Sequence, residues 1–408
     1  MTVTHEIAVV GGGLTGACIA ALLVHHGRIA PERIVLLAGG PPEPIDDGAP
    51  ALRVAAISRA SERVLRAAQA WTRLNAARLC AYERMRVWHE SAATQSAAAL
   101  CFDAADIGEP NLGFIAENSA LTHACMESFR ASGGTVVRSP LAALSITERN
   151  AQLTCEDAGT LTVRLVVGAD GAQSLVRERV GLGVRRREYR QSAIVATVRS
   201  ARAHEHTAWQ RFLHTGPLAL LPLFDGSCSI VWSADDTYAS ELRDCPVSEF
   251  NRRLDAASAG ALGEMQLASG RLSFPLRSMA AHSYIAPRCA LIGDAAHVIH
   301  PLAGLGANLG LLDAAALCGA VADAIAQRED PGAMRVLRGY EQQRRTHNVL
   351  MDAAMSALQS GFAAARGPGA WLLNRALAAV NRSAALKRAF AQQALGTAGE
   401  LPRLARSG

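Results

Sequence analysis

The stretch from Leu291 to Asp313 carries the residues of this chain best suited to chemistry, because Asp294, His297 and His300 stand in it although Val298 to Leu312 is uncharged. Four glycines interrupt the same stretch: Gly293, Gly304, Gly306 and Gly310. A glycine inside a helix costs about 1 kcal/mol relative to alanine, so an ordinary core helix would not collect so many. The pattern indicates backbone that lies close to a flat or anionic ligand.

A second chemical signal lies near the N-terminus, in the sequence Gly11-x-Gly13-x-x-Gly16. It falls between a predicted buried strand over residues 6–10 and a predicted helix over residues 14–26, which a further buried strand over 34–37 follows. Together these form a βαβ unit, in which the glycines admit a pyrophosphate to the free N–H groups of the helix. The acidic residue that usually ends the second strand and binds a ribose is absent, because Ala38 stands there.

A third segment, Ala169-Asp170-Gly171, follows a predicted buried strand, and Ser174 is placed to open the next helix. Alone it is typical of an ordinary strand-turn-helix connection. Beside the other two segments it favours a shared dinucleotide site.

Composition narrows the class of protein. Half of the 408 residues are hydrophobic and 19% are charged, as in a folded domain, and the net charge is only +5. With 5% aromatic residues, the basic cluster of Arg185–Arg187 and Arg190 predicts no nucleic-acid site. Nine cysteines form no CxxC pair, so we expect neither a metal site nor dithiol chemistry. With no leader and no long apolar run, we expect a cytoplasmic protein.

The rest of the pattern predicts an α/β fold with a Rossmann-like domain and an inserted antiparallel sheet. Helices are expected over residues 61–79 and 119–132. Strands are expected over residues 82–89, 135–137, 161–167, 194–198, 208–213, 218–221 and 228–232. The predicted domains are a dinucleotide-binding domain (1–79, 108–180 and 271–330), a substrate domain (80–107 and 181–270) and a C-terminal helical segment (331–408).

In chain order, the motifs GxGxxG, ADGAxSxVR and GDAAHxxxPxxGxGxNLG resemble those of the p-hydroxybenzoate-hydroxylase class of FAD-dependent monooxygenases. Within that class the chain is similar to the ubiquinone-biosynthesis aromatic hydroxylases, on residues 52–58, 61–63, 112–119, 220–223, 229–232 and 340–348. The likeness runs over residues 6–365. It is incomplete at Leu305 and Leu312, where those hydroxylases usually carry Gln and Arg.

The resemblance implies FAD as cofactor, NAD(P)H as a transient co-substrate, and a role for each matching residue. The expected cofactor-binding residues are Gly11, Gly13, Leu14, Thr15, Gly16, Arg53, Asn118, Asp170, Gly293, Asp294, Pro301, Gly304, Gly306, Ala307 and Asn308. Of these, the first glycine loop would hold the pyrophosphate and the late glycine bend would lie along the isoalloxazine. His300 and Pro301 are the catalytic candidates, although both His297 and His300 equally suit a structural role beside the flavin.

The activity implied by the resemblance is hydroxylation of the ring of a polyprenyl phenol in ubiquinone biosynthesis, through a flavin C4a-hydroperoxide formed with NAD(P)H and O2. Two alternatives stay open. One is a hydroxylase of a soluble aromatic compound. The other is a flavin-poor accessory member, because Ala38, Leu305 and Leu312 are apolar. Expected partners are a hydrophobic aromatic substrate, O2 and other ubiquinone-biosynthesis proteins. The basic C-terminal helices suit peripheral contact with the inner membrane.

Overall fold

The protein is described by a computed structural model that covers residues 5–40, 44–46, 48–299, 306–365, 367–383, 387 and 400–406. A six-stranded sheet in the order β19-β20-β12-β1-β2-β8 forms one part of it, with every neighbouring pair parallel except β19 and β20. Its strands are β1 (Ile7–Val10), β2 (Ile34–Leu37), β8 (Thr135–Val137), β12 (Leu165–Gly168), β19 (Ile285–Ala286) and β20 (Cys289–Leu291). Strands β1, β2 and β12 are buried along their whole length, as in parallel sheets covered on both faces.

Helices pack on this sheet and on one another. The helix α1 contacts α3 and α7, and eight consecutive residues from Gly16 to Leu23 are buried, so this apolar helix lies inside the protein. The helices of this part are α1 (Leu14–His25), α2 (Arg59–Ala67), α3 (Asn118–Ala131), α4 (Leu175–Arg179) and α7 (Gly306–Ala326). Short 3-10 helices are η1 (Pro31–Arg33), η2 (Trp71–Arg73), η3 (Ala76–Arg78), η4 (Ala104–Ile107), η5 (Gly293–Ala295) and η7 (Arg403–Ala405).

A second, nine-stranded sheet has the order β21-β18-β13-β16-β15-β14-β5-β6, with β17 paired to β13. Its pairs are antiparallel except for β14 with β5. Its strands are β5 (Arg84–His89), β6 (Leu100–Asp103), β13 (Val184–Ser200), β14 (Thr207–Leu213), β15 (Gly216–Pro222), β16 (Cys228–Asp235), β17 (Met265–Leu267), β18 (Leu272–Ala281) and β21 (His297–Val298). Helices α5 (Asp236–Asp244) and α6 (Val247–Ser258) share an apolar core with it.

Two small sheets complete the β structure. One has the order β3-β7-β4, formed by β3 (Val54–Ser58), β7 (Gly113–Glu117) and β4 (Cys80–Tyr82). The other has the order β11-β10-β9, formed by β9 (Leu141–Ile146), β10 (Ala151–Cys155) and β11 (Gly159–Val163).

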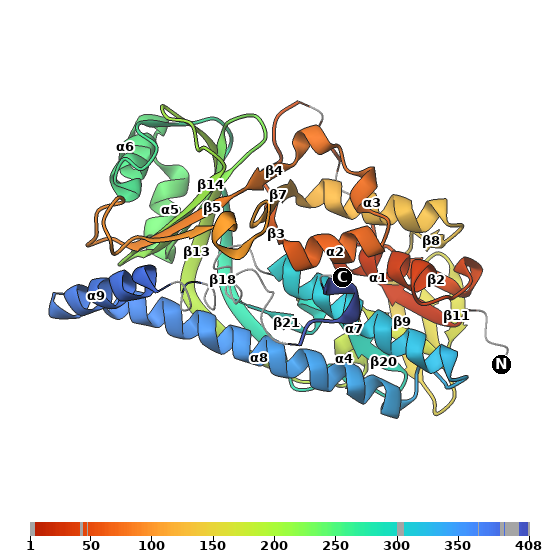
Figure 1. The fold of residues 1–408 in the computed structure, drawn as a ribbon. Coiled ribbons are helices and arrows are strands. Elements are labelled where there is room, and N and C mark those ends of the chain that lie inside the picture. The colour runs from red at the N-terminus through yellow and green to blue at the C-terminus, as the bar shows by residue number, and fades with distance from the viewer. Residues whose placement is uncertain are drawn as a thin grey trace.

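The long helix α8 (Met334–Ala364) runs beneath both large sheets, and α9 (Pro368–Arg382) follows it under the nine-stranded sheet (Figure 1). Among the described residues, one helix has the length and hydropathy to cross a membrane, namely α7. Two thirds of its apolar window (67%) is buried inside the protein, which is the pattern of a core helix.

The predicted α/β fold with an added antiparallel sheet is confirmed, and the predicted βαβ unit is found within one residue of its expected bounds. The helix expected over 61–79 was too long. It ends at Ala67 because Gln69 takes a positive φ of 53° and Trp71 turns inward against Phe114. The strand expected over 161–167 is two strands separated by Arg164.

Helices α5 and α6 had no predicted counterpart. The division into domains stays a prediction. The predicted division grouped residues 271–281 with the first domain, whereas in the structure β18 pairs with β13 in the nine-stranded sheet.

Candidate functional site

The first glycine loop packs backbone against backbone. Gly11 has a φ of +115°, and a Cβ built on it would lie 2.2 Å from the Ala169 carbonyl oxygen. A Cβ on Gly16 would lie 1.9 Å from the Gly11 carbonyl oxygen. Gly13 differs, since a Cβ there meets nothing within 4 Å. The loop is therefore closed toward the sheet and open at Gly13, where the free N–H groups of α1 begin.

Beside Gly13 lies a cleft of about 690 Å³, here called the glycine-loop cleft. Its border is made by segments that are far apart in the sequence. They include Gly13, Thr15, Ala38, Arg53, Asn118, Asp294, Gly306 and Ala307. This volume lies within the range of about 300–1,000 Å³ usual for ligand sites.

The late glycine-rich segment touches the first loop directly at Thr15. A Cβ on Gly293 would lie 2.9 Å from the Thr15 hydroxyl oxygen, and a Cβ on Gly310 would lie 2.5 Å from it. Gly293 also has a positive φ of 58°. These two glycines therefore leave room for Thr15, and the beginnings of α1 and α7 meet at one cleft.

The third motif joins the same place through a buried arginine. Ser174 accepts a hydrogen bond from the Arg177 N–H at 2.9 Å and caps α4, as predicted. The Arg177 guanidinium donates to the Ala295 carbonyl at 2.7 Å and to the Ala172 carbonyl at 2.9 Å. The three motifs read from the sequence are therefore brought together in space.

Asp294 lines the glycine-loop cleft and is exposed to it, between the buried residues Gly293 and Ala295. Burial raises the pKa of its carboxyl, and the positive charges of His297, when protonated, and of Arg53 act in the opposite direction. The side chain is thus a hydrogen-bonding group aimed at whatever fills the cleft.

Arg53 and Asn118 lie together at the other side of the cleft. The Asn118 N–H donates to the Arg53 carbonyl at 3.0 Å, which sets the two residues side by side. The Asn118 Oδ1 atom is buried and has no hydrogen-bond partner among the described residues. The Arg53 guanidinium lies 6.0 Å from the centre of the Phe274 ring. An unpaired buried oxygen in a cleft is costly unless a ligand or water satisfies it.

Two predicted cofactor residues, Asn308 and Asp170, use their side chains to bind backbone of the protein. Asn308 is buried, accepts from the Ser58 N–H at 2.9 Å and donates to the Ala56 carbonyl at 2.7 Å, so it ties α7 to β3. Asp170 Oδ2 accepts from the Val176 N–H at 3.0 Å, while its Oδ1 has no partner among the described residues. Their contact with a cofactor stays a prediction. His300, Pro301, Gly304 and Leu305 lie outside the described residues.

A buried polar network supports the late segment from behind. Asp313 is fully buried, and its Oδ2 accepts from His297 Nε2 at 2.5 Å and from the Gly293 N–H at 3.1 Å. Its Oδ1 accepts from Arg344 at 2.8 Å and from Asn348 at 3.2 Å. His297 is therefore engaged by Asp313.

The charge of Asp313 is set by these neighbours. Burial by itself raises the pKa of this carboxyl, but the charges and hydrogen bonds of His297 and Arg344 outweigh burial and hold the pKa well below its usual range. Asp313 is thus an ion at neutral pH, and it fixes the positions of η5 and β21 relative to α8.

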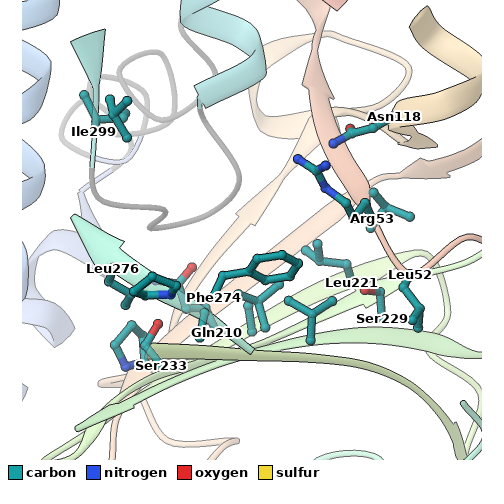
Figure 2. A pocket seen from close by; sticks show the side chains of 18 of the residues that line it. Leu52, Arg53, Asn118, Gln210, Leu221, Ser229, Ser233, Phe274, Leu276 and Ile299 are labelled. Carbon is teal, nitrogen blue, oxygen red and sulfur yellow. The ribbon is translucent and has the colours of Figure 1, made fainter. Parts of the chain in front are cut away.

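A second hollow, here called the inner cavity, has a volume of about 300 Å³ and shares Arg53, Val54 and Asn118 with the glycine-loop cleft. Most of its lining is apolar. Figure 2 shows Gln210, Ser229 and Ser233 among the residues that line it near the strands of the sheet. The Ser229 hydroxyl is buried without a hydrogen-bond partner among the described residues, so it is free for a polar group in this cavity.

These polar residues were not predicted as site residues. Along β16, Ser229, Val231 and Ser233 line the inner cavity, while Ile230 and Trp232 belong to the apolar core on the other face. The sequence signal was a period of two, because the smaller side chains of Ser229, Val231 and Ser233 alternate with the larger Ile230 and Trp232.

Comparison with known proteins gives the family. The FAD binding domain family matches residues 126–353. The chain is 34% identical over 395 residues to 3-demethoxyubiquinol 3-hydroxylase of Escherichia coli K12, covering 96% of this chain and 98% of that protein. It is 33% identical over 430 residues to the mouse ubiquinone biosynthesis monooxygenase COQ6, covering 94% and 89%.

The chain belongs to this family of FAD-dependent ubiquinone-biosynthesis hydroxylases. The resemblance expected from the three motifs is confirmed. The fold agrees as well, since the structure of Pseudomonas aeruginosa PqsL in complex with 2-aminobenzoylacetate superposes with a TM-score of 0.75 at 24% identity, covering 93% of this chain and 100% of that one. The protein is an FAD-dependent monooxygenase of the family.

The residues of the cleft fit FAD. Gly13 leaves space beside the N-terminus of α1, Asn118 has an unsatisfied oxygen, and Asp294 faces the cleft. Leu312, one of the apolar departures from the family pattern, is fully buried in the core and does not obstruct the cleft. Ala38 lines the cleft and lies close to Gly12, since a Cβ built on Gly12 would be 2.7 Å from the Ala38 Cβ.

Replacing Asp294 tests the polar contact of the cleft with the cofactor. We expect Asp294→Ala to weaken FAD binding roughly ten- to hundredfold, since a hydrogen bond to a charged group contributes about 1.5–3 kcal/mol. The measurement is the flavin absorbance per protein after purification and dialysis. Asp323→Ala is the matched control, because Asp323 lies on α7 in an exposed ion pair with Arg403. Full flavin content in Asp294→Ala would contradict the assignment.

Replacing Asp313 tests the buried network. Asp313→Asn should lower the free energy of unfolding by about 3–5 kcal/mol, since it leaves Arg344 buried without its anion. The pKa of Asp313 is lower in the folded than in the unfolded protein. The stabilisation by its charge is therefore fully present above the unfolded pKa of about 3.9, and it is lost as the pH falls through the folded-state pKa. The difference in melting temperature between wild type and variant should narrow below about pH 4. A pH-independent difference would show that the charge is not responsible.

Proposed function

We propose that the protein hydroxylates the aromatic ring of a polyprenyl phenol in ubiquinone biosynthesis, taking electrons from NAD(P)H and the oxygen atom from O2. The observation that carries the proposal is the shared border at Arg53, Val54 and Asn118, because it sets an apolar, ring-sized cavity directly beside the cleft that fits FAD. The names of the relatives, an ubiquinol hydroxylase and an ubiquinone biosynthesis monooxygenase, support this choice of substrate.

The glycine-loop cleft suits the parts of FAD in a definite order. The main-chain N–H groups at the start of α1, beside Gly13, would bind the pyrophosphate, helped by the partial positive charge of the helix N-terminus. Asp294 would accept hydrogen bonds from the ribityl hydroxyls, and Arg53 and Asn118 would lie near the flavin end. Bound FAD supplies the hydride acceptance and oxygen activation that no side chain provides.

The inner cavity suits the phenol. Its apolar walls exclude water and keep the ring oriented beside the cleft. The Ser229 hydroxyl and the Gln210 amide are polar groups in that wall, and we assign them the positioning of the ring oxygens. His297 is held by Asp313 and has a structural role, so His300 and Pro301 stay the predicted residues nearest the reacting ring.

A cytoplasmic protein in peripheral contact with the inner membrane would suit such a substrate, because a polyprenyl phenol is largely hydrocarbon. Helix α9 exposes Trp371 and Leu372, with 60% and 64% of their surface accessible. Arg375 lies beside Trp371, 4.9 Å from its ring centre, and Arg382 ends the helix. Exposed aromatic and aliphatic side chains with cations beside them suit an anionic lipid surface. The same surface would serve contact with other proteins of the pathway.

The test is turnover with defined phenols. Purified protein with FAD, NADH or NADPH and ¹⁸O2 should convert a prenylated phenol to a product that carries one ¹⁸O atom. Ser229→Ala should lower kcat/KM about tenfold through loss of one hydrogen bond. Ser200→Ala should not, because Ser200 is a partly exposed residue at the end of β13 that does not line the inner cavity.

Other outcomes separate the alternatives. Hydroxylation of soluble phenols alone would favour a hydroxylase of soluble aromatic compounds. Protein that binds no FAD would favour an accessory role and would overturn the proposal.

A further inference from the structure

A third hollow, here called the outer cavity, lies between the nine-stranded sheet and the C-terminal helices and has a volume of about 330 Å³. Strands β5, β6 and β14 form one wall, through residues such as Met85, Phe102 and Phe212. Helices α8 and α9 form the other wall, through residues such as Met355 and Leu377. No charged side chain of the described residues lines it.

The outer cavity adjoins the inner one. Gln210, Ala219 and Leu221 line both, so the two hollows meet along β14 and β15. The glycine-loop cleft, the inner cavity and the outer cavity therefore follow one another in a row. Of the three shared residues Gln210 is the polar one, and it lies at the junction of the inner and the outer cavity.

Helix α9 is fixed over the outer cavity by polar contacts at its rim. Asn374 donates to the Ser91 hydroxyl at 3.0 Å, and Asn381 donates to the Ala97 and Ala99 carbonyls at 3.3 Å. Inside the cavity wall, the rings of Phe212 and Phe362 stack with their centres 4.0 Å apart. The apolar hollow is thus a built feature of the contact between sheet and helices.

The outer cavity reaches the surface between α8 and α9. Two of its lining residues are exposed, namely Leu358, with 37% of its surface accessible, and Ala376. Trp371 and Leu372, on the same helix as Ala376, are the exposed apolar side chains discussed above. An opening of this kind lets a long apolar chain pass from the interior to the surface.

We propose that the outer cavity binds the isoprenoid tail of the substrate and that the tail leaves the protein between Leu358 and Ala376. The inference rests on the proposed function for the presence of a tail. The occupant follows from the lining and the order of the hollows. A wall without charge excludes an anionic or cationic group. A ring held in the inner cavity directs a substituent past Gln210 into the outer one. A tail longer than the cavity must emerge at its mouth.

The test narrows the mouth without touching the ring site. Ala376→Trp places a large side chain at an exposed position that lines the cavity, and Ala379→Trp places the same side chain at an exposed position of α9 that does not line it. Both should fold, because neither position is buried. With a phenol that carries a long isoprenoid tail, Ala376→Trp should lower kcat/KM at least about tenfold, mostly through KM. With the tail-less phenol, both variants should match wild type.

A binding measurement separates failure of this inference from failure of the proposed activity. Radiolabelled geranylgeraniol, delivered from cyclodextrin, has the tail without the ring. It should bind wild type and Ala379→Trp and bind Ala376→Trp at least about tenfold more weakly. Equal binding to all three proteins, or no binding to wild type, overturns the tail site whatever the turnover shows. Binding as expected without ring hydroxylation sustains the tail site and rejects the proposed reaction.

Discussion

The structure depends on close contact between two stretches of backbone that are almost three hundred residues apart. The start of α1 meets η5 and the first turns of α7 at Thr15, with Gly293 and Gly310 leaving the space it occupies. A side chain at either glycine would press on Thr15. Because the contact is made by small residues, the N–H groups of α1 remain at the wall of an open cleft. The cofactor site is therefore open because glycines, which have no side chain, make the contact between these two stretches.

The Asp313 network keeps this contact in place. It links Gly293 and His297 on one side to Arg344 and Asn348 of α8 on the other. The same helix continues beneath the nine-stranded sheet and supplies Met355, Leu358 and Phe362 to the wall of the outer cavity (Figure 1). One long helix thus supports both the cofactor cleft and the hollow that we assign to the substrate tail. A change in the tilt of α8 would therefore alter both the cofactor cleft and the outer cavity.

The parts that could be predicted from the sequence are those set by local pattern. The unit from β1 to β2 has buried apolar strands, a glycine loop and an apolar helix in succession, and each has a strong local signal. The three motifs also implied one shared site, and the hydrogen bond from Arg177 to the Ala295 carbonyl shows how the Asp170 segment reaches the late glycine-rich stretch. The family resemblance added FAD, which the cleft accommodates.

The parts that were missed depend on contacts distant in sequence. The alternation along β16 places Ser229 on one face of the strand, but it does not show that this face lines a cavity, because the opposite wall comes from β18 and from Leu52 to Val54. The helix expected to reach residue 79 stops early because Trp71 packs on Phe114, a residue of β7. The side chain of Asn308 ties α7 to the backbone of β3, a partner about 250 residues away that the sequence does not indicate. Such roles depend on which segments the fold sets side by side.

The most direct test of the central claim is to titrate wild-type and Gly13→Val apoprotein with FAD and to measure binding by the quenching of flavin fluorescence. A Cβ at Gly13 meets no protein atom within 4 Å, so the variant should fold with an unchanged melting temperature. Its side chain would fill the place assigned to the pyrophosphate, and FAD affinity should fall by about a hundredfold or more. Unchanged affinity in the variant would show that FAD does not lie against the start of α1.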